Sequence, residues 1–111
     1  MAGPCAVQVC GVEGGAVEVI VTGELDMSCA SDLFAAVITA SGLPDVQEVV
    51  VDLGGIGFMD SSGLAALIKA QQKLAGDGQS LRVSSASRPA AMLFEITDTT
   101  TLFTSPVTST D

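Results

Sequence analysis

One continuous stretch, residues 49–64, constrains the fold of this chain more than any other. It reads VVVDLGGIGFMDSSGL and passes from β-branched residues through glycines to a short polar cluster. The run Val49–Leu53 is typical of a buried strand. From Leu64 onward, apolar residues recur at helical spacing, at positions 64, 67, 68 and 74. The stretch therefore predicts a strand followed by a helix, with Asp60 to Gly63 at the junction.

The polar cluster has the composition of a helix start. Asp or Ser at that place accepts hydrogen bonds from backbone N–H groups that lack a partner inside the helix. We therefore expect Asp60 to cap the helix, with Ser61 and Ser62 in its first turn. A phosphate on Ser61, with about −1.5 to −2 charges, would be favoured by the helix N-terminus and repelled by Asp60. On the tetrapeptide alone, helix capping without any phosphate is the simpler interpretation.

Composition and charge narrow the class of protein. The 111 residues suit one domain, which we expect to span 1–111 with loose ends at 1–4 and 106–111. Hydrophobic residues make up 48% of the chain and there is no Trp or Tyr, so the core should be tight and built of small side chains. The formal net charge of −9 disfavours binding to nucleic acid or to an anionic membrane surface. It is compatible with a basic protein partner.

The cysteines and the absence of apolar targeting segments indicate in which compartment the protein is found. No stretch approaches the length of a membrane span, and the first residues do not resemble a signal peptide. Cys5, Cys10 and Cys29 are too few, and odd in number, for a disulfide framework. If Cys5 and Cys10 share a strand, their odd separation puts them on opposite faces, so they cannot pair locally. We therefore expect a reducing, cytoplasmic location.

A hairpin and a helix are predicted in the first part of the chain. Strands at 7–10 and 16–22 flank the turn Glu13-Gly14-Gly15, which is typical of an antiparallel pair. Apolar residues then recur at positions 30, 33, 34, 37 and 38, a helical pattern. Either Asp26 or Ser28 can cap this helix.

The second half of the chain alternates strands and helices. The strand at 46–53 leads into the helix at 61–75, and a short strand follows at 81–84. A strand–helix–strand crossover requires parallel neighbours, whereas the initial hairpin is antiparallel. The sequence therefore predicts an α/β fold with a mixed sheet, in which helices cover one face well and the other face less.

One more helix is predicted near the C-terminus. It starts at Ser87-Arg88-Pro89, with Pro89 at the first helical position. The residues expected on its apolar side are Met92, Leu93 and Ile96, with Phe94 at the margin. Residues 101–103 are a candidate for a last edge strand.

Several segments together resemble the STAS domain family, and within it the bacterial anti-sigma factor antagonists of the SpoIIAA type. Residues 23–26 read GELD, similar to the sequence after the family's second strand, although this match alone is weak. Residues 50–53 and 58–64 read VVDL and FMDSSGL, and the second of these matches is highly specific in this context. Residues 88–96 are similar to the family's late helix. The resemblance covers nearly the whole chain. It implies the STAS fold: a small mixed sheet of four to five strands, with three to four helices mainly packed on one face.

The resemblance also implies a phosphorylation switch. In the family, the first Ser after the Asp, here Ser61, is phosphorylated by an anti-sigma factor that is itself an ATP-using serine kinase. The unphosphorylated antagonist binds that anti-sigma factor and a sigma factor is released, and a PP2C-type phosphatase restores the active form. The family places the acid of GELD, here Asp26, near the serine. The implied partner-binding residues are Asp26, Asp60, Ser61, Ser62 and Gly63, and Ser62 is the less favoured phosphorylation site.

The sequence lacks the residues that the common catalytic and nucleotide-binding motifs require. The chain has no His, so it cannot form a Ser-His-Asp triad, and its cysteines lack a tight metal-ligand spacing. Gly54, Gly55 and Gly57 match neither a P-loop nor a dinucleotide-binding fingerprint, so we interpret them as room for the strand to bend into the helix. We therefore predict a kinase substrate without cofactor or metal, not an enzyme. The competing interpretation is a STAS module that does not switch: a scaffold of a signalling complex or an accessory subunit of a transport system.

Overall fold

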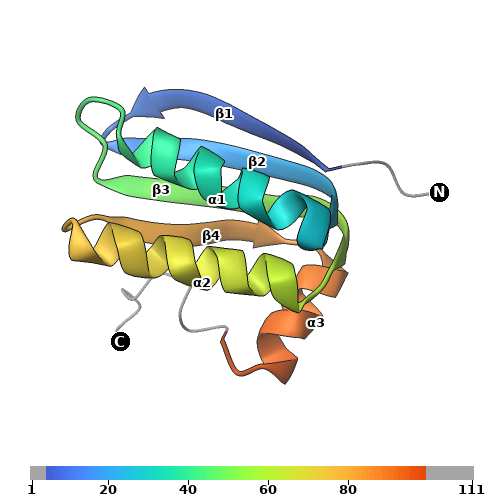
Figure 1. Cartoon of the computed structure of the whole chain (residues 1–111). Coiled ribbons are helices and arrows are strands. Elements are labelled where there is room, and N and C mark those ends of the chain that lie inside the picture. Colours follow the sequence, from blue (N-terminus) through green and yellow to red (C-terminus); the bar gives the residue numbers. More distant parts are fainter. Residues whose placement is uncertain (1–4, 100–111) are drawn as a thin grey trace, which may run out of the picture.

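The computed structural model describes residues 5–99, which form four strands and three helices (Figure 1). In chain order the elements are β1 (Ala6–Glu13), β2 (Ala16–Leu25), α1 (Met27–Ser41), β3 (Glu48–Met59), α2 (Ser61–Gly76), β4 (Ser80–Ala86) and α3 (Arg88–Ile96). The predicted order of strands and helices is confirmed up to α3. The candidate strand at 101–103 lies outside the described residues.

The sheet is mixed, with strand order β1-β2-β3-β4. β1 and β2 pair antiparallel around Gly14 and Gly15, whose φ angles of 63° and 83° suit glycine in a tight turn. β3 pairs parallel with both β2 and β4, because α1 and α2 carry the chain back to the starting edge between strands. The predicted α/β fold is confirmed.

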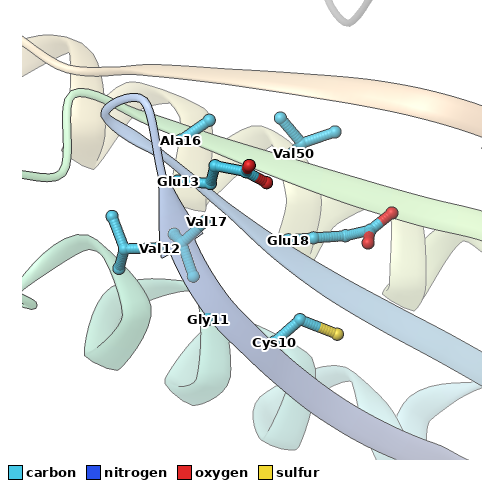
Figure 2. Close-up of a pocket in the computed structure, with 8 residues that line it drawn as sticks. All are labelled: Cys10, Gly11, Val12, Glu13, Ala16, Val17, Glu18 and Val50. Atoms are coloured by element: carbon cyan, nitrogen blue, oxygen red, sulfur yellow. The ribbon is translucent and has the colours of Figure 1, made fainter.

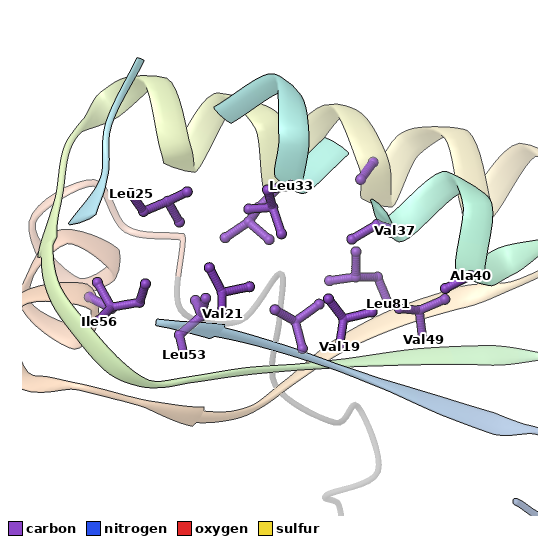
Figure 3. Close-up of a cluster of buried hydrophobic side chains, with 14 of the residues drawn as sticks. Val19, Val21, Leu25, Leu33, Val37, Ala40, Val49, Leu53, Ile56 and Leu81 are labelled. Atoms are coloured by element: carbon purple, nitrogen blue, oxygen red, sulfur yellow. The ribbon is translucent and has the colours of Figure 1, made fainter. Parts of the chain in front are cut away.

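The hydrophobic core lies between the sheet and the pair α1 and α2 (Figure 3). Alternate residues of the two central strands are fully buried: Val17, Val19, Val21, Val49, Val51 and Leu53. Leu33 of α1 and Leu67 of α2 are fully buried with them. On the other side of the same strands, Glu18, Ile20 and Asp52 are only half-buried. Within residues 5–99, one face of the sheet is thus better covered than the other, as predicted.

β3 is longer than predicted, and its glycines have a different role. The strand continues past Leu53 to Met59, so the glycines lie inside it rather than in a bend. A Cβ atom built on Gly55 would lie 2.7 Å from Cγ2 of Thr22 on the neighbouring strand. Glycine is depleted in strands, which is why the sequence suggested an end at Leu53. Close approach of a neighbouring strand is a situation in which a strand does use glycine.

Of the three residues predicted on the inward face of α3, Leu93 is half-buried against the core, but the other two predictions were wrong. Phe94, placed at the margin, is 5% exposed, whereas Met92 and Ile96 are 50% and 76% exposed. Ala90 and Phe94 lie one turn apart and are the buried residues of this helix, which packs against β3 and β4. Because the helix is short, its apolar residues are compatible with two different buried faces. Packing against the sheet selects the face that carries Ala90 and Phe94.

The number and spacing of the cysteines did not predict a disulfide, yet the structure contains one. A disulfide joins Cys5 to Cys29, and their Cα atoms are 6.1 Å apart. Cys5 precedes β1, and Cys29 lies in the first turn of α1. The bond therefore links segments that only the folded topology brings together, and the count of cysteines could not reveal it. Cys10 is free.

Candidate functional site

Two acidic residues lie at the same edge of the sheet, next to each other in the strand order. Asp26 follows β2 and Asp60 follows β3, and the residues before them, Leu25 and Met59, are register partners in the parallel pair. The backbone N–H of Asp60 donates a hydrogen bond to the carbonyl oxygen of Leu25 at 3.3 Å. The fold therefore brings together two of the predicted site residues that are far apart in the sequence.

Each of these acids caps the helix that follows it. Oδ1 of Asp60 accepts hydrogen bonds from the backbone N–H groups of Ser62 at 2.8 Å and Gly63 at 3.3 Å. Oδ1 of Asp26 accepts from the backbone N–H of Ser28 at 3.0 Å and from its hydroxyl at 2.6 Å. The prediction that Asp60 is an N-cap is confirmed. Of the two caps considered for α1, the structure uses Asp26.

The environment of Asp26 favours its charged form. The hydrogen bond from the Ser28 hydroxyl lowers the pKa of Asp26 below its ordinary value, and partial burial opposes that shift. Backbone N–H groups of Ser28 and Cys29 lower the pKa further. Asp26 is therefore a carboxylate at neutral pH and keeps this edge of the sheet negative.

Removing the Asp60 cap should destabilise the protein. Asp60→Ala leaves two N–H groups at the start of α2 without their side-chain acceptor. We expect a loss of about 1 kcal/mol in the free energy of unfolding, measured by urea denaturation followed by circular dichroism. Asp60→Asn is the matched control, because an amide oxygen can still cap the helix, and it should lose much less. Equal stability of the Ala variant and the wild type would contradict the capping role.

The two serines differ in exposure. Ser61 is the first residue of α2 and is exposed, whereas Ser62 is half-buried. Ser61 follows Asp60 directly, at a helix N-terminus whose partial positive charge favours an anion. A group attached to the Ser61 oxygen would thus lie at the surface, at the end of the sheet that carries Asp26 and Asp60.

Gly63 is buried and leaves no room for a side chain. A Cβ atom at this position would lie 2.6 Å from Cγ of Leu25 and 2.9 Å from the Leu25 carbonyl oxygen. Because of this close approach, the first turn of α2 packs directly on the end of β2. Gly63 therefore lets the start of α2 lie close against the end of β2.

A groove between α1 and α2 was not predicted from the sequence. It has a volume of about 370 Å³ and is lined by Met27, Ala30, Ser31, Phe34, Ser62, Ala65, Ala66 and Lys69. Met27 is 76% exposed, and the ammonium of Lys69 lies 5.5 Å from the centroid of the Phe34 ring, a cation–π contact. The sequence held one signal for it: small residues follow Gly63 at 65 and 66, where two helices can approach closely.

A second hollow lies at the other end of β2 (Figure 2). It is lined by Cys10, Gly11, Val12, Glu13, Ala16, Val17, Glu18 and Val50. Ala16 is the first residue of β2, whereas Asp26 follows its last, so the hollow is remote from Ser61. Over residues 5–99, the Cys, Asp and Glu side chains form no group of three or more that could hold a metal ion. None of the helices in that range combines the length and the apolar character needed to cross a membrane.

Comparison with known proteins agrees with this architecture. A family model described as "Mlab, STAS domain" matches residues 11–104. The crystal structure of an anti-sigma factor antagonist from Mycobacterium paratuberculosis is similar, with 25% identity and a TM-score of 0.77, over 90% of this chain and 83% of that one. The anti-sigma factor antagonist SpoIIAA in its unphosphorylated form matches with 21% identity and a TM-score of 0.74, over 88% of this chain and 85% of that one. The Bacillus cell fate determinant SpoIIAA in its phosphorylated form matches with 21% identity and a TM-score of 0.68, over 88% of both chains.

Proposed function

Because this chain belongs to the STAS domain family, we propose that it is an anti-sigma factor antagonist controlled by phosphorylation of Ser61. In its unphosphorylated form it binds an anti-sigma factor serine kinase, and a sigma factor is thereby freed. Phosphorylation of Ser61 switches this binding off, and a PP2C-type phosphatase restores it. The protein acts in the cytoplasm as a binding protein that regulates transcription, with no reaction of its own.

The exposed position of Ser61 at the start of α2 is the observation that carries this proposal. A kinase can reach a hydroxyl that projects from the surface at the first residue of a helix. Asp26 and Asp60 make the surroundings acidic, so the unmodified edge suits a basic or hydrogen-bonding partner surface. A phosphate adds about −1.5 to −2 charges in the middle of that contact, beside the two carboxylates.

The groove between α1 and α2 extends the proposed contact with an apolar component. Met27, at the start of α1, exposes most of its side chain at the rim, and Ser62 lines the same groove. Flexible methionine side chains adapt well to a partner surface. The proposed partner-binding set is therefore Asp26, Asp60, Ser61 and Ser62, while Gly63 acts through its packing on Leu25.

The similar structures support this proposal at a coarse level. SpoIIAA has been solved in unphosphorylated and phosphorylated forms, so a protein of this fold can carry the modification. The assignment to Ser61 rests on the sequence FMDSSGL and on the exposure of Ser61 compared with Ser62.

Kinase assays test the proposed function directly. The purified chain is incubated with ATP and candidate anti-sigma factor kinases, and its phosphopeptides are identified by mass spectrometry. We expect modification of Ser61, none in Ser61→Ala, and continued modification of Ser61 in Ser62→Ala. Modification of Ser62 in the wild type would move the switch to that residue. If no kinase modifies the chain and it instead copurifies in a large multi-copy assembly, the non-switching scaffold or accessory subunit is the correct interpretation.

A further inference from the structure

The Cys5–Cys29 disulfide lies near the proposed switch, yet the proposed function makes no use of it. The Cα separation of 6.1 Å is within the usual range for disulfides. Cys29 is buried, with 3% of its surface exposed, and Cys5 is half-buried against the core. The bond closes a loop that contains the whole β1–β2 hairpin and returns to the first turn of α1.

Direct contacts connect this bond to the edge that carries Ser61. The backbone N–H of Cys29 donates to the carbonyl oxygen of Asp26 at 3.0 Å. One residue earlier, the carbonyl of Leu25 accepts from Asp60, and the Leu25 side chain packs against Gly63. The segment from Leu25 to Cys29 thus touches the disulfide at one end and the start of α2 at the other.

Apart from this bond, the start of β1 is held by its pairing with β2 and by the packing of Val7 against the core. In the part of the chain that the structure describes, β1 is an edge strand with β2 as its one neighbour, and Ala6 and Gln8 near its start are exposed. Without the bond to Cys29, Cys5 and the first turn of α1 would be less constrained relative to each other. Strand edges and helix ends of this kind belong to the regions of a protein that open most easily.

We propose that Cys5 and Cys29 form a reversible thiol–disulfide switch that adjusts how strongly the edge around Ser61 binds its partner. This inference rests on the proposed function, because an antagonist of an anti-sigma factor acts in the cytoplasm. Disulfides there are seldom permanent and are more often transient and redox-sensing. The oxidised form holds the start of α1 in the geometry seen in the structure and therefore binds more tightly, since a pre-organised surface loses less freedom on binding.

The chemistry requires only a low-molecular-weight thiol and its disulfide. A reductant thiolate attacks Sγ of Cys5, the more accessible sulfur; the Cys5–Cys29 bond breaks, and Cys29 leaves as a thiolate. A second reductant thiolate then attacks the reductant sulfur of the mixed disulfide and releases Cys5 as a thiolate. Two electrons pass from the two reductant thiolates to the protein sulfurs, solvent supplies the two protons, and one small disulfide is formed. Oxidation by that small disulfide is the reverse of these two exchanges.

The thiol state is tested first and does not depend on any partner. The full chain is equilibrated with glutathione and glutathione disulfide at stepped ratios. It is then unfolded in denaturant that contains an alkylating agent, and analysed by mass spectrometry. We expect Cys5 and Cys29 to be protected together at oxidising ratios and alkylated together at reducing ones, with Cys10 alkylated throughout. The oxidised form should melt about 10–20 °C higher than the reduced form, because the bond closes the loop from Cys5 to Cys29. Alkylation of Cys5 and Cys29 at every ratio would overturn the proposal.

Partner affinity is tested second, with a matched control. We expect the oxidised wild type to bind the anti-sigma factor kinase about tenfold more tightly than the reduced form, the size of a typical coupling between two sites. Cys5→Ser, at the half-buried position, should bind like the reduced form under all conditions, whereas Cys10→Ser should respond like the wild type. Equal binding by both redox forms would overturn the proposal. If the cysteines pair but neither form binds any anti-sigma factor kinase, the proposed function is wrong, and the bond then serves stability alone.

Discussion

Ser61→Asp weakens binding to the anti-sigma factor kinase by about 100-fold or more, while Ser61→Ala binds as tightly as the wild type and cannot be phosphorylated. The added carboxylate lies at the first residue of α2, next to Asp60 and at the same sheet edge as Asp26. In the centre of a contact it becomes a buried negative charge without a partner, which costs about 3–5 kcal/mol. Each 1.4 kcal/mol corresponds to about a factor of ten in affinity, so the loss spans two decades or more.

Matched variants separate charge from size. The Asn side chain has nearly the shape of Asp but no charge. Ser61→Asn should therefore retain most of the free energy of binding to the kinase. Affinities are measured by calorimetry with and without ATP, and the wild type should lose affinity with ATP in parallel with its phosphorylation. The Ala and Asp variants should both fold normally, because an anion at a helix N-terminus is tolerated within the chain. Equal binding by these two variants would refute the electrostatic explanation of the switch.

The features that the sequence predicted well are those determined by neighbours in the chain. Asp60 caps α2 because its side chain reaches the backbone N–H groups of Ser62 and Gly63, two and three residues further on. Gly14 and Gly15 form the hairpin turn because only local backbone geometry is involved. The alternation of β2 and the helical stripe of α1 follow from the periods of strand and helix. The candidate site was accessible to sequence reasoning because its central residues, Asp60 to Gly63, are consecutive.

The features that were missed depend on segments far apart in the chain. β3 extends to Met59 because β2 continues beside it as far as Leu25, which no local pattern reveals. Phe94 is buried because α3 meets the sheet with that face. The Cys5–Cys29 bond and the groove beside Met27 exist only once α1 is placed against β1 and α2. Of the parts of the site that involve two elements, the nearness of Asp26 to Ser61 was expected only from the family resemblance, and the groove was not predicted.

Gly63→Val is expected to destabilise the fold by about 3 kcal/mol, near the upper end for overpacking a core. Its Cβ would come within 2.6 Å of Cγ of Leu25 and 2.9 Å of the Leu25 carbonyl oxygen. Leu25 is fully buried and one of the two contacts is with its backbone, so a rotation of its side chain cannot relieve both. The first turn of α2 must then shift away from β2, although valine is slightly better than glycine within a helix.

Gly76→Val is the matched control, because Gly76 ends the same helix and a Cβ there meets no atom within 4 Å. Urea denaturation should show that its free energy of unfolding changes by less than about 1 kcal/mol. The Gly63 variant should also lose partner affinity where it still folds, since the shift of α2 moves Ser61 away from Asp26. If the free energy of unfolding of Gly63→Val equalled that of the wild type, Leu25 would have to move aside without any loss of stability. The close contact between α2 and β2 would then not be what brings Ser61 and Asp26 to the same end of the sheet.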